Sequence, residues 1–256
     1  EQLNLSTEDA KLLEDLYESF KANGATLNKD DKEKYRKLSM DLSMLTLQFD
    51  QNALKDKNRF ELLITDENEL SGLPESARDA AAMLAKSKDK NGWLFNLSAP
   101  SYIPFMRYSD KRDLREKMYR EYMSVGNKGD EFDNKDIIKK IVNIRLEIAQ
   151  LMGFKNYAEY ALEHTMAKNS ANVYKLLNQL LEAYKPIAIN EYNAVEGFAL
   201  GTEKENITVM PWDWSYYSEK LRDIRFKVND EMTRPYFELS NVKKGVFGLA
   251  TQLYGI

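Results

Sequence analysis

Long apolar stripes with helical spacing constrain the fold of this chain more than any other feature. The most regular stripe comprises Ile137, Ile138, Ile141, Ile144, Ile148 and Leu151. A second stripe, spaced by three and four residues, comprises Tyr35, Leu38, Leu42, Leu45 and Phe49. Residues three and four positions apart share one face of an α-helix. Both segments are therefore predicted to be amphipathic helices, the second running from about residue 30 to beyond 54.

The N-terminal residues predict a shorter helix. Ser6 and Thr7 precede Glu8 and Asp9 in a pattern typical of a capping box. The apolar stripe that follows is Leu12, Leu13, Leu16, Tyr17 and Phe20. Gly24 is expected to end this helix. The apolar stripe of the helix over 30–54 fits a long antiparallel hairpin with this first helix.

The segment between residues 60 and 123 predicts a small sheet among helices. Residues 60–65 and 93–98 lack helical spacing and are rich in strand-forming residues, so they are expected to pair as a two-stranded ribbon. The alanine-rich stretch 74–86 reads as a short helix. Pro100 and Pro104 predict two turns, and a helix over 111–123 should follow. Its inward-facing residues are predicted to be Leu114, Met118 and Tyr122.

The remaining segments are also predicted to be helical. Residues 125–133 read as a surface loop. Asn156 should cap a short helix, and Pro186 should kink or break a longer one that opens at 169 or 170. From residue 230, two last helices should carry packing groups at 236–237 and 246–247. The whole chain reads as one helical region, with a possible division into a hairpin and ribbon over 1–125 and a bundle over 134–256.

The densest aromatic cluster lies in the run Met210-Pro211-Trp212-Asp213-Trp214-Ser215-Tyr216-Tyr217. Pro211 should end the preceding segment, and Asp213 is expected to cap a new helix. The buried face of that helix is predicted to be Trp214, Tyr217 and Leu221. The cluster either packs in the hydrophobic core or forms a wall that contacts a ligand, and we favour the core. The candidates for a substrate-channel wall are Trp212, Asp213, Trp214, Tyr216 and Tyr217.

This motif carries a resemblance to a known family. Pro-Trp-Asp-Trp followed by paired tyrosines, together with Arg-Pro-Tyr-Phe-Glu-Leu at 234–239, resembles the thimet oligopeptidase family of zinc metallopeptidases. The resemblance is strongest to its peptidyl-dipeptidase (dipeptidyl carboxypeptidase) branch. Further similar segments lie at 13–27, 70–74, 151–158, 166–167, 245–247 and 253–256.

The resemblance implies a mainly α fold: helical hairpins and a bundle with a small ribbon, forming one wall of a channel-type (neurolysin-like) metallopeptidase. It also implies a parent enzyme that cleaves oligopeptides and releases C-terminal dipeptides, using a zinc-bound water as nucleophile. The His-Glu-x-x-His motif that holds zinc in this family does not occur in this sequence. We therefore expect an internal fragment with no catalytic residues and no zinc of its own, inactive without the missing C-terminal catalytic half.

No other catalytic chemistry is indicated. The sequence has one histidine, His164, and no cysteine, so a set of His and Cys ligands for a metal is not available. No phosphate-binding glycine loop and no Gly-x-Ser-x-Gly motif occurs. The alternatives to a peptidase fragment are a stand-alone helical module that binds a peptide or protein, and a pseudo-enzyme that keeps only the scaffold.

The charge of the chain argues against two classes of partner. A net charge of −4 does not favour nucleic acid or an anionic membrane, because both select clustered basic surfaces. No apolar run approaches the length needed to cross a bilayer, and residues 1–9 do not resemble a signal peptide. We expect a cytoplasmic location, with the periplasm left open because the true N-terminus is expected to lie upstream.

Overall fold

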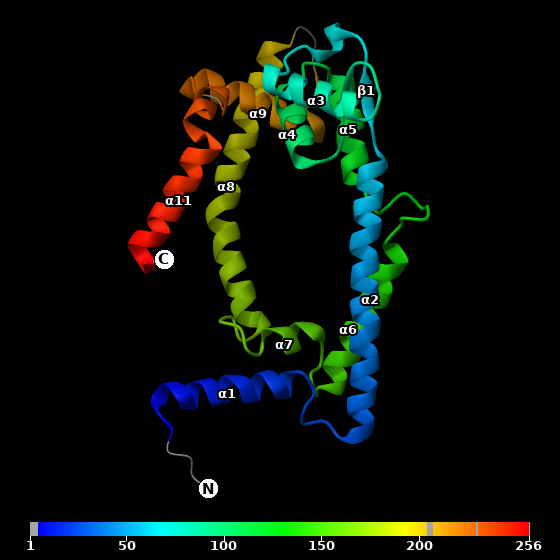
Figure 1. The fold of residues 1–256 in the computed structure, drawn as a ribbon, viewed down its shortest axis with the longest axis vertical. Helices are drawn as coiled ribbons and strands as arrows, with labels where there is room; N and C mark the ends of the chain where they lie inside the picture. The colour runs from blue at the N-terminus through cyan, green and yellow to red at the C-terminus, as the bar shows by residue number, and fades with distance from the viewer. Residues whose placement is uncertain (1–4, 204–206, 229, 256) are drawn as a thin grey trace. The chain divides into compact units, whose positions relative to one another are not determined.

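The computed structural model describes residues 5–203, 207–228 and 230–255. It is mainly α with one two-stranded antiparallel sheet, as predicted. The helices are α1 (Thr7–Ala22), α2 (Lys29–Arg59), α3 (Glu75–Ser87), α4 (Ala99–Tyr108), α5 (Arg112–Met123), α6 (Lys135–Leu151), α7 (Tyr157–Leu162), α8 (Ser170–Thr202), α9 (Pro211–Phe226), α10 (Asp230–Thr233) and α11 (Leu239–Tyr254) (Figure 1). Two short 3₁₀ helices, η1 (Glu67–Leu70) and η2 (Arg234–Phe237), and the strands β1 (Leu62–Ile64) and β2 (Trp93–Phe95) complete the fold.

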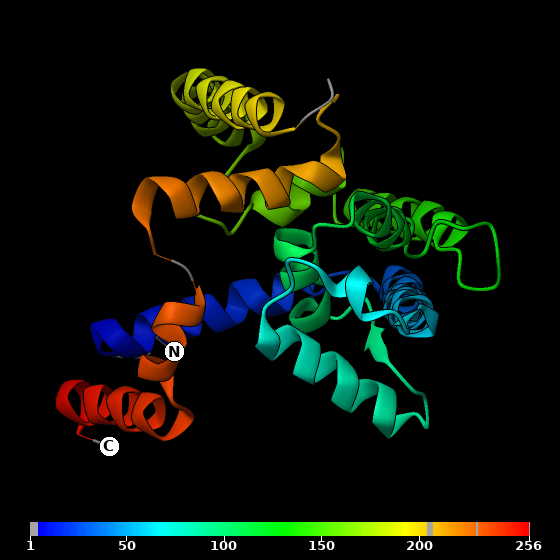
Figure 2. The ribbon, with the colours of Figure 1, turned by 90° about the horizontal axis from the view of Figure 1, so that it is seen from above.

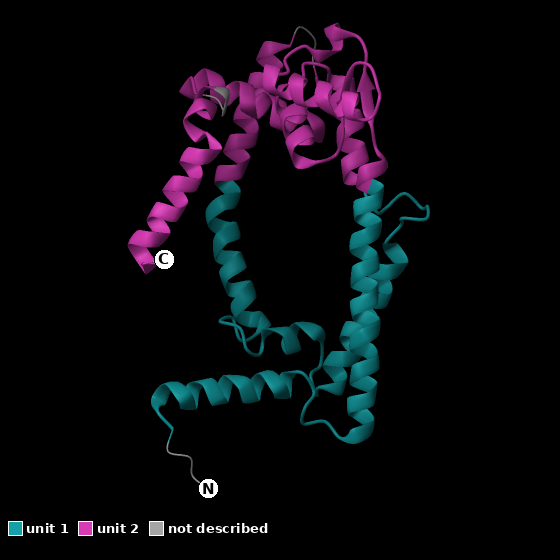
Figure 3. Ribbon diagram, viewed as in Figure 1, with its two compact units in different colours: residues 1–56, 124–186 teal, residues 57–123, 187–256 magenta. Residues whose placement is uncertain are grey.

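The chain divides into two compact units, each built from two segments (Figure 3). Unit 1 comprises residues 1–56 and 124–186, and unit 2 comprises residues 57–123 and 187–256. The chain therefore passes between the units three times, inside α2, directly after α5 and inside α8. The possible division into 1–125 and 134–256 stays a prediction. Among the described residues, no helix combines the length and apolar character that a membrane span requires.

Helix α1 begins as predicted but lacks the predicted partner. The Ser6 hydroxyl oxygen accepts a hydrogen bond from the Asp9 N–H at 3.1 Å and caps the helix. Figure 1 shows α1 lying crosswise to α2 rather than alongside it, so the expected antiparallel hairpin does not form. The hydroxyl of Tyr160 in α7 donates to the Ala22 carbonyl at 2.7 Å and holds the end of α1 instead. No residue of α1 is buried within the described structure.

Helix α2 is joined to the start of α6 by buried polar contacts. The Asn52 side chain donates to the Asn134 oxygen at 3.1 Å, and Asn134 donates to the Phe49 carbonyl at 3.0 Å. Asp56 is fully buried, accepts the Gly126 N–H at 2.7 Å and pairs with Lys128. These contacts anchor the predicted loop over 125–133 to α2. Of the predicted α6 stripe, Ile137, Ile141 and Ile148 are buried.

Unit 2 contains most of the fully buried apolar side chains. The predicted ribbon forms with Leu62 opposite Phe95 and Ile64 opposite Trp93. Helix α3 packs on β2, and α4 packs on α3, α5 and α9. The least exposed apolar residues of this core are Ile64, Leu70, Leu94, Phe95, Leu97, Phe105 and Met118. Of the residues predicted to face inward from α5, Met118 is buried and Tyr122 is exposed.

Two predictions based on proline are wrong. Pro100 and Pro104 both lie in α4 rather than in turns. Pro100 lies in the first turn, where the missing N–H has no helical partner to lose, and Pro104 removes one helical hydrogen bond that packing on α3, α5 and α9 outweighs. Helix α8 continues through Pro186 without a break, and the alternative of a kink stays a prediction.

The predicted packing groups of the last helices are wrong as well. Tyr236 and Phe237 in η2 are exposed, as are Val246 and Phe247 in α11. Helix α11 buries no residue within the described structure. Its apolar stripe therefore forms an exposed face, which comprises Val242, Val246, Phe247, Leu249 and Leu253.

Candidate functional site

The aromatic motif forms the first turns of α9. Met210 is the residue before the helix, and Pro211 takes the first helical position, where its fixed φ and missing N–H carry no penalty. Asp213 caps the helix as predicted, although it does so from the third helical position while Met210 is the N-cap residue. It lies in the first turn, and its carboxylate accepts the Met210 N–H at 3.1 Å. The carboxylate therefore satisfies a backbone group that precedes the helix.

The buried face of α9 differs from the predicted one. Trp212, Asp213, Tyr216 and Tyr217 are buried, whereas Trp214 is 38% exposed. Helix α9 packs against both α4 and α5, and Figure 2 shows this group from above. The tyrosines join Val195 and Ala199 of α8 in one apolar cluster, and Leu221 packs against it as predicted. The motif thus contributes mainly to the core, which is the reading that we favoured.

Two arginines of α5 converge on Asp213. The Arg112 Nη2 lies 2.7 Å from one carboxylate oxygen, and the Arg115 Nη2 lies 2.8 Å from the other. Asp213 is fully buried and Arg115 is 1% exposed. A charge buried to this degree needs both an opposite charge and hydrogen bonds, and Asp213 has them. These two ion pairs fix the start of α9 on α5.

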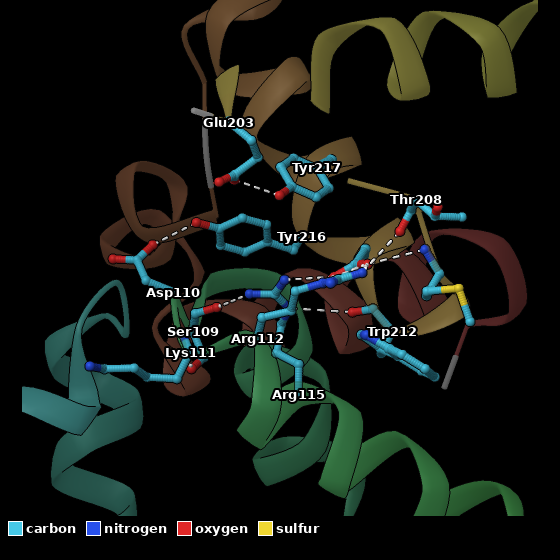
Figure 4. A network of polar contacts seen from close by, with 12 residues as sticks. Ser109, Asp110, Lys111, Arg112, Arg115, Glu203, Thr208, Trp212, Tyr216 and Tyr217 are labelled. Carbon is cyan, nitrogen blue, oxygen red and sulfur yellow. Dashed lines mark hydrogen bonds and ion pairs between the residues drawn. The ribbon is translucent and has the colours of Figure 1, made fainter. Parts of the chain in front are cut away.

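Arg115 uses its remaining N–H groups on backbone carbonyls (Figure 4). It donates to the Ser109 carbonyl at 2.7 Å and to the Trp212 carbonyl at 3.3 Å. Its guanidinium carbon also lies 4.0 Å from the centre of the Tyr216 ring, which is a cation–π contact. Arg115 therefore links α5, the residue after α4 and the first turns of α9.

The environment shifts the pKa of these groups in opposite directions. Burial alone would raise the pKa of Asp213, but hydrogen bonds from Arg112, the Met210 N–H and Arg115 outweigh it and lower the pKa below its ordinary value. Burial raises the pKa of Tyr216 and of Tyr217. Hydrogen bonds reinforce this, because the Tyr216 hydroxyl donates to Asp110 at 2.7 Å and the Tyr217 hydroxyl donates to Glu203 at 2.6 Å. Around neutral pH the carboxylate is charged and both phenols are neutral.

The two tryptophans of the motif have different surroundings. The Trp212 ring lies beneath the guanidinium of Arg120, 4.9 Å from its centre, and near the Tyr119 ring. Its buried Nε1–H has no hydrogen-bond partner among the described residues. Trp214 instead stacks on Tyr192 of α8, with ring centres 5.8 Å apart and planes inclined by 8°. Trp214 is the most exposed of the five substrate-channel candidates.

The described residues do not fit a zinc ion. No group of three or more His, Cys, Asp or Glu side chains in residues 5–203, 207–228 and 230–255 could hold a metal. His164 follows α7 rather than lying within it, and its Nε2 is 3.3 Å from Glu163 and 3.9 Å from Glu18. We derive no catalytic step through zinc from these side chains. The network around Asp213 holds a helix in place and does not activate a nucleophile.

Sequence reasoning missed Arg112 and Arg115. Arg115 lies one residue after Leu114 and three before Met118, so it occupies the inward face of an otherwise apolar helical pattern. An arginine at such a position could have been paired with the single acid of the aromatic motif. The inward position of Arg115 could be inferred from the sequence, but helical spacing does not indicate which distant segment supplies its acidic partner.

Comparison with known proteins places the chain among peptidases. The model of peptidase family M3 matches residues 105–256. Oligopeptidase A of Salmonella typhimurium is 36% identical over 98% of this chain, and a probable cytosolic oligopeptidase A of Arabidopsis thaliana is 37% identical over 99%. Dipeptidyl carboxypeptidase of Escherichia coli is 31% identical over the full chain.

The matches cover only part of these relatives. The chain spans 38%, 37% and 38% of the length of the three proteins. The resemblance in the aromatic motif and the family match agree, since residues 210–222 lie inside the matched range. The family match covers more than half of the sequence. This chain belongs to peptidase family M3.

Proposed function

We propose that this chain is the non-catalytic helical part of a zinc-dependent peptidase that cleaves short peptides. The observation that carries the proposal is the family match over residues 105–256, supported by relatives named as oligopeptidases and a dipeptidyl carboxypeptidase. The chain itself contributes one histidine and no cysteine. Zinc and the groups that activate water would therefore be held by residues outside this chain, and the isolated chain would hydrolyse nothing.

The finer activity that we propose is release of C-terminal dipeptides from oligopeptides. The motif resemblance favours this peptidyl-dipeptidase type. The named relatives include both oligopeptidases A and a dipeptidyl carboxypeptidase, so cleavage at internal bonds is the competing activity. Analysis of the products from one N-blocked peptide separates the two, because only the first yields dipeptides exclusively from the C-terminal end.

We propose that the remainder of the parent enzyme covers the exposed apolar faces of this chain. Three faces are candidates: the stripe of α1, the face of α11 and the first half of α8, where Tyr174, Leu177 and Leu181 are exposed. Contiguous apolar surface of this kind is typical of an interface. One relative is named as cytosolic, which supports a cytoplasmic location for the parent.

We also propose that the aromatic motif forms part of the wall of a substrate channel. Most of its members support this wall from behind, because Trp212, Asp213, Tyr216 and Tyr217 are buried. Trp214 is the member that reaches the surface. Tryptophan combines a large apolar area with a polar N–H, which suits contact with an unstructured peptide.

The test is a comparison of two proteins. This chain and a longer protein expressed from the same reading frame would be incubated with an N-blocked peptide, and both would be assayed for bound zinc. We expect zinc and dipeptide release from the longer protein only, with loss of release on chelation. Chelator-sensitive hydrolysis by the short chain would overturn the proposal. A longer protein that neither binds zinc nor cleaves would favour the pseudo-enzyme.

A further inference from the structure

Tyr192 and Trp214 form an aromatic face on the surface of unit 2. Tyr192 lies on α8 and Trp214 on α9, and their rings are nearly parallel with centres 5.8 Å apart. Tyr192 is 42% exposed, similar to Trp214. The neighbouring aromatic residues of the motif are buried, so Trp214, together with Tyr192, is the aromatic surface that a ligand could reach.

A carboxylate lies at the edge of this face. Glu196 is one turn further along α8, and its Oε1 accepts a hydrogen bond from the Tyr192 hydroxyl at 3.3 Å. The face of an aromatic ring carries negative partial charge, and a carboxylate beside it adds a full negative charge. The aromatic face and Glu196 together therefore attract a cation and repel an anion.

Other aromatic rings of the same unit already hold cations. Arg115 lies over Tyr216 at 4.0 Å, and Arg120 lies over Trp212 at 4.9 Å. Within residues 5–203, 207–228 and 230–255, no lysine or arginine lies over Tyr192 or Trp214. The aromatic face thus has the same chemistry as the rings that hold an arginine. No arginine of the described residues lies over it.

We propose that Tyr192, Trp214 and Glu196 bind a basic side chain of a short peptide, with arginine preferred. The planar guanidinium stacks on the exposed part of the aromatic face, and its N–H groups pair with the Glu196 carboxylate beside Tyr192. The exposed Ile189, one turn before Tyr192, offers apolar surface for the aliphatic stem of the same side chain. The site rests on the proposed peptide function and assigns it a substrate class, namely peptides that carry a positive charge.

An apolar peptide side chain is the competing occupant, and charge decides between the two. A site for an apolar side chain gains nothing from a carboxylate at its edge, because a half-buried charge is disfavoured beside an apolar ligand. The basic side chain uses both components of the site. Peptides that differ only in the charge of one side chain distinguish a basic occupant from an apolar one.

The experiment measures binding rather than hydrolysis. Three acetylated and amidated pentapeptides, identical except for arginine, citrulline or norleucine at the centre, would be titrated into this chain by NMR or calorimetry. Citrulline keeps the shape of arginine and removes its charge. An exposed cation–π contact and an exposed ion pair together correspond to a preference for arginine of about three- to tenfold.

Two variants test the assignment of the residues. Glu196→Gln removes the charge, and Trp214→Leu removes the ring while it keeps an apolar side chain. We expect each variant to reduce the preference for arginine over citrulline to about twofold or less. The matched control is Glu191→Gln, which removes an exposed carboxylate from the same helix and should leave the ratio unchanged. Circular dichroism would verify that each variant is folded.

The results separate this inference from the proposed function. Equal binding of the three peptides, preferred binding of the norleucine peptide, or no binding at all would overturn the arginine site. An unchanged ratio in Glu196→Gln or Trp214→Leu would overturn it too. These outcomes do not depend on zinc or cleavage. Failure of the longer protein to hydrolyse peptides would instead count against the proposed function and leave the binding ratio intact.

Discussion

Helices α9 and α11 have the same length of 16 residues and opposite environments. Helix α9 carries more charged side chains, yet it buries five residues, including Asp213 and Glu219. Helix α11 is richer in small and apolar residues, yet it buries none within the described structure. The composition of the two helices would suggest the reverse.

The difference shows that burial depends on the partner that a helix meets. Helix α9 meets α4 and α5, and α5 supplies the arginines that make a buried carboxylate tolerable. The apolar face of α11 meets no equivalent surface in the described chain. The face of α11 is accordingly one of the three that we propose are covered by the remainder of the parent enzyme.

The largest expected effect comes from Asp213→Ala. The substitution leaves the buried guanidinium of Arg115 without its carboxylate, and breaking a buried pair in this way costs about 3–5 kcal/mol. Urea denaturation followed by circular dichroism would measure the free energy of unfolding. Leu249→Ala on α11 is the control, with an expected change below about 0.5 kcal/mol. A loss below about 1 kcal/mol in Asp213→Ala would show that the pair does not hold α9.

The two arginines should differ in their contributions. Arg115→Met removes a buried cation and its hydrogen bonds to two backbone carbonyls, and we expect a loss of about 2–4 kcal/mol. The Arg112 side chain is 42% exposed, so water screens its interaction with Asp213 and Arg112→Met should cost about 1 kcal/mol. The same urea titration compares them. Equal losses of stability in Arg115→Met and Arg112→Met would contradict the prediction that the more buried arginine contributes more.

Acid should weaken the chain through Asp213. Because the pKa of this carboxyl is lower in the folded chain than in the unfolded one, its contribution is complete above the ordinary value of about 3.9 and is lost as the pH falls below it. We expect the stability of the native chain to fall as the pH drops below about 4, and that of Asp213→Asn to fall less. If the free energies of unfolding of the two proteins fell in parallel with pH, the Asp213 carboxyl would not be the cause of the acid sensitivity.

The smallest expected effect on stability comes from the exposed face of α11. Phe247→Ala should change the free energy of unfolding by less than about 0.5 kcal/mol, although truncation of a core phenylalanine typically costs about 3–5 kcal/mol. The same face should cause self-association and binding of a hydrophobic dye by the isolated chain. Phe247→Ser should reduce both. A monodisperse chain that binds no dye would contradict an exposed apolar face.

The sequence predicted the helices better than their contacts. Spacing located α2, α6 and the cap of α1, because local hydrogen bonds and side-chain periodicity determine these features. It failed at Pro104, where the packing of α4 outweighs one lost hydrogen bond. It also assigned Trp214 to the core and overlooked Arg115. Pairing of residues about a hundred positions apart is not encoded in local spacing, so the buried pair required the structure.

Hydrogen exchange would test the contrast between α9 and α11 most directly. Amide exchange would be measured on this chain and on a longer protein from the same reading frame. We expect the amides of α9 to be protected in both proteins, and those of α11 to be protected only in the longer one. Equal protection of α11 in the two proteins, or rapid exchange throughout α9 in the short chain, would contradict the account.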